Sequence, residues 1–253
     1  MSATFPRAQA LRVSEIWRYP VKSLRGEQLA HTRVTADGVA GDRLVHVADS
    51  GGLLTGRTRH RLLSLDARTG PTGQPLVTGR PWDSPEAAAA VREAAGPDAR
   101  LVADPASARF DILPLLVLTR AEADALDIDL RRLRPNIVID GALPEQERDW
   151  PGRALRIGTT VIGVHSLRPR CVVTTIDPDT GEQDLEVFRR IRRQRDASLA
   201  LNCWILQPGQ LSVGDDVEVL DVPPLPDQRA MPSPGGWVTG APYRRSPHES
   251  PVT

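Results

Sequence analysis

Short apolar runs separated by turn residues fill most of this chain. Several are rich in β-branched residues or alternate apolar with polar positions, which is typical of strands that bury one face. Many short strands at this spacing indicate a β-barrel or a sandwich. We therefore expect a mainly β fold with a few helices. The expected strands are residues 11–19, 28–35, 43–48, 53–55, 62–67, 112–118, 136–139, 154–157, 160–165, 172–176, 200–207 and 211–220.

Two stretches interrupt the strand pattern with helical signals. Residues 87–95 are rich in alanine, the residue with the highest helix propensity. Thr119 and Glu122 have the spacing of a capping box, in which the threonine accepts a hydrogen bond from the backbone and the glutamate reaches back to the helix start. We expect a helix from this box to about Leu133.

A third helix is expected at residues 184–195, where basic residues are concentrated. Leu185, Phe188 and Ile191 have the spacing of a helix face that packs against a core, which leaves most of the arginines pointing outward. The pattern favours a solvated helix face. The alternative is a docking patch for an acidic partner, whose affinity would then depend on salt and on these arginines.

Turn residues and composition divide the chain into three parts. Residues 10–105 are expected to form an antiparallel, barrel-like β module with a hairpin around Ser50-Gly51-Gly52. The strand pattern then restarts, and residues 106–221 are expected to form a second β-barrel domain. Residues 222–253 contain eight prolines and three glycines with little apolar periodicity, so that we expect this tail to be disordered.

The overall composition excludes several classes of protein. The chain has 32 basic residues (lysine and arginine) and 32 acidic ones, so that its formal net charge is zero. The charge balance therefore gives no sign of a nucleic-acid or membrane partner. The chain has no long apolar run, and residues 1–10 lack the apolar core of a signal peptide, which indicates a cytoplasmic protein. Its two cysteines cannot build a disulfide framework.

Cys171 is the first candidate for chemistry. Arg168 and Arg170 precede it, and a β-branched run at residues 172–176 follows it. Cationic neighbours favour the thiolate, so that the pKa of this thiol is expected below the ordinary value of about 8.5. The alternative is a small buried cysteine at the end of a strand. These residues alone leave both interpretations open.

Lys22 is the second candidate, because it is the only lysine among 32 basic residues. Lysine carries a compact charge on a thin stem, which suits a narrow anion site or imine chemistry. The chance survival of one lysine in an arginine-rich composition explains the pattern equally well.

Familiar motifs are missing from the sequence, and arginine-bearing turns are its positive signal. There is no paired Cys/His spacing for zinc, no GxGxxG fingerprint, no phosphate loop and no GxSxG elbow. Redox chemistry would therefore need a bound cofactor that takes few protein ligands. Arginines at the expected strand ends have the planar groups that bind phosphates and polar heterocycles. These turns are Asp42-Arg43, residues 57–61, Arg134-Pro135-Asn136 and residues 168–170.

Six short motifs, taken in order, carry a resemblance to a known family. They are YPVKS at residues 19–23, GDR at 41–43, LRPNIVIDG at 133–141, RC at 170–171, TTIDPDTGE at 174–182 and PGQLSVGDDV at 208–217. Together they resemble proteins in which a molybdenum cofactor sulfurase C-terminal (MOSC) domain follows an N-terminal β-barrel domain. This group includes the mitochondrial amidoxime-reducing component and its bacterial relatives. The resemblance extends over about residues 10–220.

The resemblance implies a molybdopterin-type molybdenum cofactor, whose metal is held by the pterin and by one protein thiolate. In this chain that thiolate falls on Cys171, which would be both the metal ligand and the catalytic residue. The lysine and the arginines would neutralise the cofactor phosphate and orient the pterin. The implied cofactor contacts are Lys22, Ser23, Arg43, Thr119, Arg134, Asn136, Arg170 and Asn202.

The resemblance also implies an activity. We expect an oxidoreductase that reduces a small N-hydroxylated or N-oxide compound with electrons from a separate protein, because the sequence has no flavin, haem or iron–sulfur motif. The alternatives are a non-catalytic carrier of the cofactor and a sulfur-transfer protein that holds a persulfide on Cys171. Pyridoxal phosphate, which would form an imine on Lys22, is not expected, since a lysine that contacts phosphate is poorly available for an imine.

Overall fold

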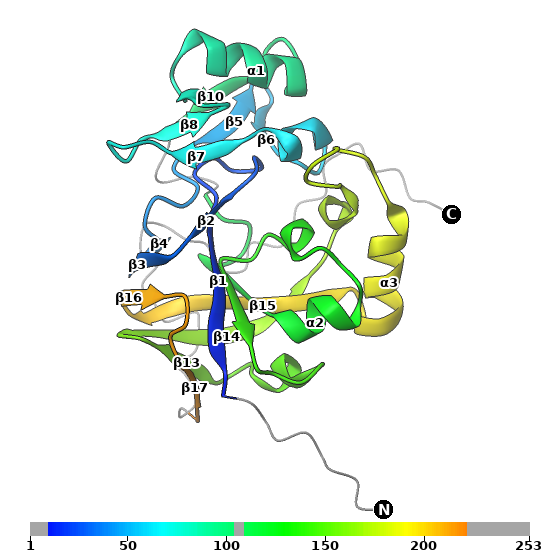
Figure 1. Ribbon diagram of the computed structural model, residues 1–253. Coiled ribbons are helices and arrows are strands. Elements are labelled where there is room, and N and C mark those ends of the chain that lie inside the picture. Colours follow the sequence, from blue (N-terminus) through cyan, green and yellow to red (C-terminus); the bar gives the residue numbers. More distant parts are fainter. Residues whose placement is uncertain (1–9, 104–108, 222–253) are drawn as a thin grey trace, which may run out of the picture.

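The computed structural model describes residues 10–103 and 109–221, and strands dominate them (Figure 1). The expectation of a mainly β fold with a few helices is confirmed. The strands are β1 (Arg12–Arg18), β2 (Glu27–Leu29), β3 (His31–Thr35), β4 (Gly38–Val39), β5 (His46–Asp49), β6 (Gly52–Leu54), β7 (Ala67–Thr69), β8 (Pro75–Val77), β9 (Arg80–Pro81), β10 (Arg100–Val102), β11 (Leu115–Thr119), β12 (Ile137–Asp140), β13 (Ala154–Ile157), β14 (Thr160–Pro169), β15 (Ser198–Gln207), β16 (Gly209–Ser212) and β17 (Val217–Leu220). The helices are α1 (Pro85–Ala95), α2 (Arg120–Ala125) and α3 (Leu185–Arg195), with 3-10 turns η1 (His60–Ser64), η2 (Leu130–Leu133), η3 (Gln146–Asp149) and η4 (Val172–Thr175).

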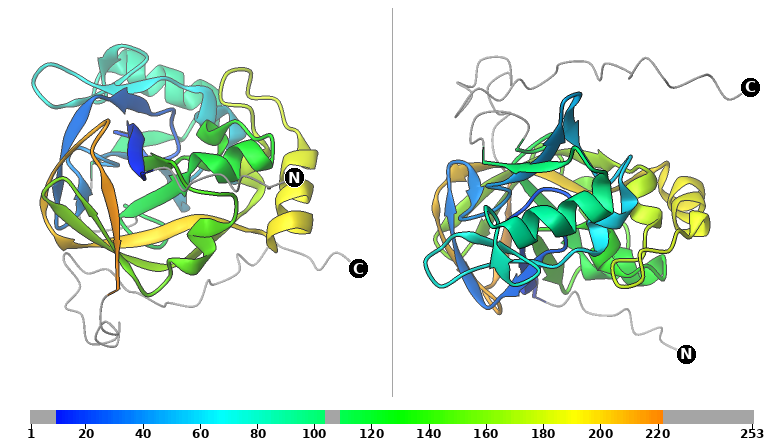
Figure 2. Two further views of the ribbon diagram at one scale, coloured as in Figure 1. Left: turned by 60° about the horizontal axis from the view of Figure 1, so that its bottom comes forward. Right: turned by 90° about the horizontal axis from the view of Figure 1, so that it is seen from above.

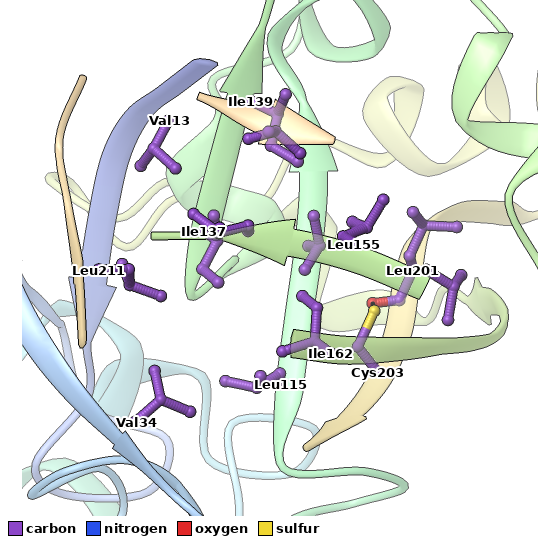
Figure 3. Packing of buried hydrophobic residues seen from close by; sticks show 14 of the residues in the cluster. Val13, Val34, Leu115, Ile137, Ile139, Leu155, Ile162, Leu201, Cys203 and Leu211 are labelled. Carbon is purple, nitrogen blue, oxygen red and sulfur yellow. Dashed lines mark hydrogen bonds between the residues drawn. The ribbon is translucent and has the colours of Figure 1, made fainter. Parts of the chain in front are cut away.

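An eight-stranded sheet forms the larger half of the molecule, in the order β17-β13-β14-β15-β11-β12-β1-β2. Its neighbours are antiparallel except for β11 and β12, which run parallel. The strands curve around a core of aliphatic side chains that includes Ile137, Leu155 and Leu201 (Figures 2 and 3). Each such side chain contributes roughly 1.5–3 kcal/mol by leaving water, so that this core holds the curved sheet closed.

Three small sheets complete the fold, in the orders β10-β5-β6, β7-β8-β9 and β16-β3-β4. The first two lie with α1 at one end of the molecule and enclose a second core that includes Leu62, Val77 and Val91 (Figure 1). The expected hairpin around Ser50-Gly51-Gly52 is formed by β5 and β6. Strands β1 and β2 belong to the large sheet, and β3 pairs with β16, so that the first strands tie both halves together. A domain boundary near residue 105 stays a prediction.

Helices α1 and α3 form where the sequence predicts them. The Ser84 hydroxyl accepts a hydrogen bond from the Ala87 amide (3.2 Å), and proline follows it at the first position of α1. The Asp184 carboxylate accepts one from the Glu186 amide (2.9 Å) at the start of α3. The expected disordered tail, residues 222–253, lies outside the described residues.

The expected helix from Thr119 to Leu133 is wrong in its length. Helix α2 ends at Ala125, and Asp127 has a left-handed backbone conformation (φ 48°) before η2 begins. In a continuous helix Ile128 would lie about 200° around the axis from Leu126, on the opposite face. The break allows both side chains to enter a third apolar cluster, and burial outweighs helix propensity.

The expected capping box is also wrong. Thr119 stands at the start of α2 with an extended backbone, but its side chain makes no cap hydrogen bond. Glu122 does not reach back to the helix start. Its carboxylate accepts from Arg195 Nε (2.7 Å) and from the Glu145 amide, in a buried position. A buried cation outcompetes the helix start for this carboxylate, because the ion pair must be satisfied away from water.

The expected strand at 172–176 is replaced by the 3-10 turn η4, and only Ile176 after it has an extended backbone. The Thr174 hydroxyl donates to the Cys171 carbonyl (2.9 Å), and the Thr175 hydroxyl donates to the Val172 carbonyl (2.6 Å). Threonine can bond locally in this way, which offers the backbone an alternative to a strand. The expected strand at 62–67 is likewise replaced by η1 and β7, and the expected strands at 28–35 and 211–220 are each divided into two.

The buried face of α3 differs from the expected one. Val187, Ile191 and Arg195 are buried, whereas Leu185 is 48% exposed and Phe188 is half-buried. The spacing of four residues brings the buried residues onto one face, as helix geometry requires. Of the three residues predicted to face the core, only Ile191 is fully buried, and it lies in the third apolar cluster.

Candidate functional site

All the sequence-predicted site residues except Thr119 come together from both halves of the molecule, most of them near the ends of strands. Lys22 and Ser23 follow β1, and Arg43 follows β4. Arg134 follows η2, and Cys171 follows β14. Ser23, Arg43 and Arg134 all have positive φ angles (70°, 51° and 57°). Residues other than glycine rarely adopt this backbone conformation, and such backbone strain is frequent at functional sites.

Asp42 is a buried residue whose carboxylate links the segment that follows β4, in which it lies, to the segment that follows β1. Its carboxylate accepts hydrogen bonds from the Tyr19 amide (2.6 Å), from the Arg43 guanidinium and from Asn136 Nδ2 (3.3 Å). Its backbone carbonyl accepts from Arg109 Nε (2.9 Å) and Nη2 (2.7 Å). One carboxylate therefore fixes the positions of two predicted site residues, Arg43 and Asn136.

Asn136 uses its side chain to join strands. Its Oδ1 accepts from the Leu116 amide (3.1 Å), and its Nδ2 also donates to the Trp17 carbonyl (3.3 Å). The residue is 1% exposed. Asn136 thus bonds to β11 and β1 and to Asp42, and these contacts position its neighbour Arg134.

Two of the predicted arginines lie over the ring of Tyr19. The Arg134 guanidinium is 4.3 Å from the centre of the tyrosine ring and the Arg43 guanidinium is 4.9 Å from it. The Tyr19 hydroxyl donates to the Pro135 carbonyl (3.0 Å). Burial raises the pKa of Tyr19 and lowers that of Arg134 to about 10, although the arginine stays protonated at neutral pH. The ring holds both cations by cation–π contact.

Lys22 meets a carboxylate that the sequence did not indicate. Its Nζ lies 2.9 Å from Asp111 Oδ1. The second oxygen of Asp111 lies 3.1 Å from Arg168 Nη2 and 3.4 Å from Arg57 Nη2. Burial lowers the pKa of Lys22. Burial alone would raise the pKa of Asp111, but the three cations hold it well below its usual range. Asp111 precedes an apolar run and belongs to no motif, so that only the fold identifies it.

We call the three cations around Asp111, namely Lys22, Arg57 and Arg168, the cation cluster. Cys171 is a free, half-buried thiol at the rim of this cluster. Arg168 and Arg170 are its electrostatic neighbours. The Arg170 guanidinium donates from Nη2 to the Leu133 carbonyl (2.7 Å), but its buried Nε has no partner among the described residues. Burial and the charge of Arg168 lower the pKa of Arg170 to about 10. A buried donor without a partner costs free energy, and a bound acceptor would remove that cost.

The second cysteine has no part in the site. Cys203 is fully buried among the side chains of the first core (Figure 3), and burial raises the pKa of its thiol. Cys203 is thus a core residue of β15.

Asn202 orients Arg168. Its Oδ1 accepts from Arg168 Nη1 (3.3 Å), and its Nδ2 donates to the Ser166 hydroxyl (3.2 Å) and the Leu167 carbonyl (3.3 Å). Through Arg168 it reaches Asp111, so that a chain of hydrogen bonds runs from β15 to Lys22.

Thr119 lies away from these contacts. It is fully buried, and its amide donates to Glu147 Oε2 (2.7 Å). Its hydroxyl oxygen has no partner among the described residues. Glu147 also accepts from the Ala200 amide (3.0 Å), and burial raises the pKa of this glutamate to about 7. The structure thus joins Thr119 to a buried carboxylate and not to the cation cluster.

Comparison with known families identifies the class of protein. The MOSC domain model matches residues 114–218, and the model of the MOSC N-terminal β-barrel domain matches residues 10–108. Together they extend over nearly all of the described residues. The chain belongs to the MOSC domain family and carries the MOSC N-terminal domain before it, as the motifs indicate.

Individual relatives match over parts of their length. The human mitochondrial amidoxime reducing component 2 is 34% identical over 94 residues, which are 32% of this chain and 27% of that protein. The mouse mitochondrial amidoxime-reducing component 1 is 33% identical over 129 residues, 44% of this chain and 37% of that protein. The molybdenum cofactor sulfurase of Anopheles gambiae is 35% identical over 74 residues, 29% of this chain and 9% of that protein. The matches therefore span well under half of these relatives.

A solved structure supports the fold. The YuaD protein from Bacillus subtilis superposes with a TM-score of 0.50 over 85% of this chain and 98% of that protein, at 12% identity. Such a likeness shows a shared fold alone. Among the described residues of the present chain, no helix has the length and apolar character needed to cross a membrane.

Proposed function

We propose that this chain binds a molybdopterin-type molybdenum cofactor where its two halves meet, and that it reduces N-hydroxylated or N-oxide compounds. The observation that carries the proposal is a single half-buried thiol, Cys171, beside Arg168 and Arg170 at the rim of a cation cluster. The family and the amidoxime-reducing relatives support the same chemistry.

The donor set fits this cofactor. A thiolate is a soft ligand that suits molybdenum, and Cys171 can supply it. Lys22 and Arg168 supply the positive charge that an anionic phosphate requires. The buried Arg170 Nε offers a hydrogen bond that no described residue accepts, and an acceptor atom of the pterin would satisfy it.

When bound, the cofactor would supply the two-electron chemistry, and the residues of this chain would hold and orient it. Tyr19 would keep Arg43 and Arg134 in fixed orientations, so that little ordering is left to occur on binding. Asn202 would hold Arg168 toward the cluster. The ion pair of Lys22 with Asp111 favours the protonated amine and therefore disfavours the imine that pyridoxal phosphate would need.

Metal and pterin analysis tests the proposal. Protein made in a host that synthesises the cofactor is expected to contain molybdenum and pterin, and Cys171→Ser is expected to lose reductase activity with disturbed metal binding. Cys203→Ala is the matched control, because its thiol lies in the core and should not affect the metal content. Wild-type protein without molybdenum would end the proposal.

The half-exposed position of Cys171 also suits a sulfur-transfer protein, the second candidate function. A persulfide on Cys171 needs an accessible thiolate and no metal. Mass spectrometry of the intact protein separates the two functions, since a mass increase of one sulfur atom on Cys171 in metal-free protein would favour sulfur transfer. A carrier without catalytic activity would contain molybdenum but reduce no substrate.

A further inference from the structure

Helix α3 is attached at both ends to the segment that carries Cys171. Before the helix, the Asp184 amide donates to the Thr175 carbonyl (2.7 Å), and Gln183 Nε2 donates to the Thr175 hydroxyl (3.1 Å). After it, the Ala197 carbonyl accepts from the Arg170 amide (2.7 Å). Hydrogen bonds thus join α3 to the chain on both sides of Cys171. A protein that docks on α3 would lie against this helix and hence close to the segment that carries Cys171.

The outward surface of α3 combines apolar and cationic side chains. Leu185, Phe188 and Arg192 are spaced by three and four residues and form one row along the helix. Leu185 is 48% exposed, and Phe188 is half-buried. Arg189 and Arg193 lie beside this row. We call these five residues the α3 strip.

The charge of the strip is only partly neutralised within the chain. Glu186 pairs with Arg189 (2.8 Å) and with Arg193 (3.6 Å), and one carboxylate is thus shared by two arginines. Arg192 is exposed and has no ion pair among the described residues. The remaining two arginines of α3 point elsewhere, since Arg190 donates to the Leu126 carbonyl (2.6 Å) and Arg195 pairs with buried Glu122. The outward face of α3 is therefore distinctly cationic.

We propose that the α3 strip is the docking surface for an acidic electron-carrier protein. Aromatic and arginine side chains are enriched at protein interfaces, the exposed Leu185 adds apolar area beside them, and complementary charge accelerates the encounter. The inference rests on the proposed function, which requires external electrons. Two reduced one-electron carriers are oxidised for each N–OH group, and their two electrons with two protons from water yield N–H and one water molecule.

A charge reversal with a matched control tests the surface. The probe is an acidic [2Fe–2S] ferredoxin, and its binding to the cofactor-loaded protein is measured by calorimetry at low and high ionic strength. The test variant carries Arg189→Glu, Arg192→Glu and Arg193→Glu. The control carries Arg80→Glu, Arg92→Glu and Arg100→Glu, three exposed arginines of the N-terminal half with the same change in charge. Thermal unfolding checks that both variants fold.

We expect ferredoxin to bind the wild type at low ionic strength and to dissociate with added salt. The Kd should rise about tenfold or more in the α3 variant, and by no more than about twofold in the control. Reduction of an N-hydroxylated substrate with dithionite should be equal in all three proteins. Absent binding to the wild type, or equal binding to the α3 variant, would overturn the docking proposal. Absent dithionite activity in the loaded wild type would instead overturn the proposed function.

Discussion

Asp111 Oδ1 lies 2.9 Å from Lys22 Nζ, and this ion pair joins a residue that follows β1 to one that precedes β11. Arg57 and Arg168 approach the same carboxylate. The carboxylate thus balances three cations at the place where the proposed function needs an anion to bind. An anionic cofactor must either displace Asp111 from these cations or share them with it.

Removal of this charge should open the cluster to other anions. In Asp111→Asn, Lys22 and Arg168 lose their carboxylate, and we expect the free energy of unfolding to fall by about 1–2 kcal/mol, because Asp111 is partly exposed and water screens the pair. Inorganic phosphate should then raise the Tm of this variant more than that of the wild type. Differential scanning fluorimetry with increasing phosphate measures both effects. The exposed Asp98→Asn is the control, and equal phosphate shifts in all three proteins would refute this role for Asp111.

Glu147 should make stability depend on pH in the weakly acidic range. Burial raises its pKa to about 7 in the folded protein, against about 4.5 in the unfolded chain. Between these values the folded state holds the proton more tightly, so that the free energy of unfolding falls as the pH rises from about 4.5 to about 7, by on the order of 2–3 kcal/mol.

Glu147→Gln removes this titration while keeping one acceptor for the Thr119 or the Ala200 amide. Urea unfolding at a series of pH values should show a flatter profile for this variant than for the wild type. Glu182→Gln changes an exposed carboxyl and serves as the control. A wild-type profile that is equally flat between about pH 5 and about pH 7 would contradict the raised pKa.

Tyr19 should contribute through its hydroxyl and its ring separately. Tyr19→Phe loses the hydrogen bond to the Pro135 carbonyl and should lower the free energy of unfolding by about 1 kcal/mol, with the contacts to Arg43 and Arg134 retained. Tyr19→Leu also removes the aromatic face and should lower it by roughly 1–2 kcal/mol more. The leucine variant alone should retain less molybdenum than the wild type. Identical stability and metal content in the two variants would show that the ring does not hold the arginines.

Local sequence determined much of the fold and the list of candidate residues. The short apolar runs specified most strands, since alternation of side chains is a property of a strand by itself. The alanine-rich run at 87–95 and the apolar spacing at 184–195 predicted α1 and α3, because helix propensity and side-chain spacing act between near neighbours. The motifs around Lys22 and Cys171 indicated the family, which the comparisons confirmed. The roles of these residues in binding a cofactor stay predictions.

The tertiary structure decided which partner each polar residue takes. Glu122 pairs with Arg195, 73 positions away, and not with the start of its own helix. Asp111 meets Lys22 only because the chain between them folds as the N-terminal half. Leu185 stays exposed because burial of Val187 and Ile191 sets the rotation of α3. Sequence patterns report interactions between near neighbours, whereas ion pairing and burial depend on residues far along the chain, and the free energy of these contacts exceeds that of local preference.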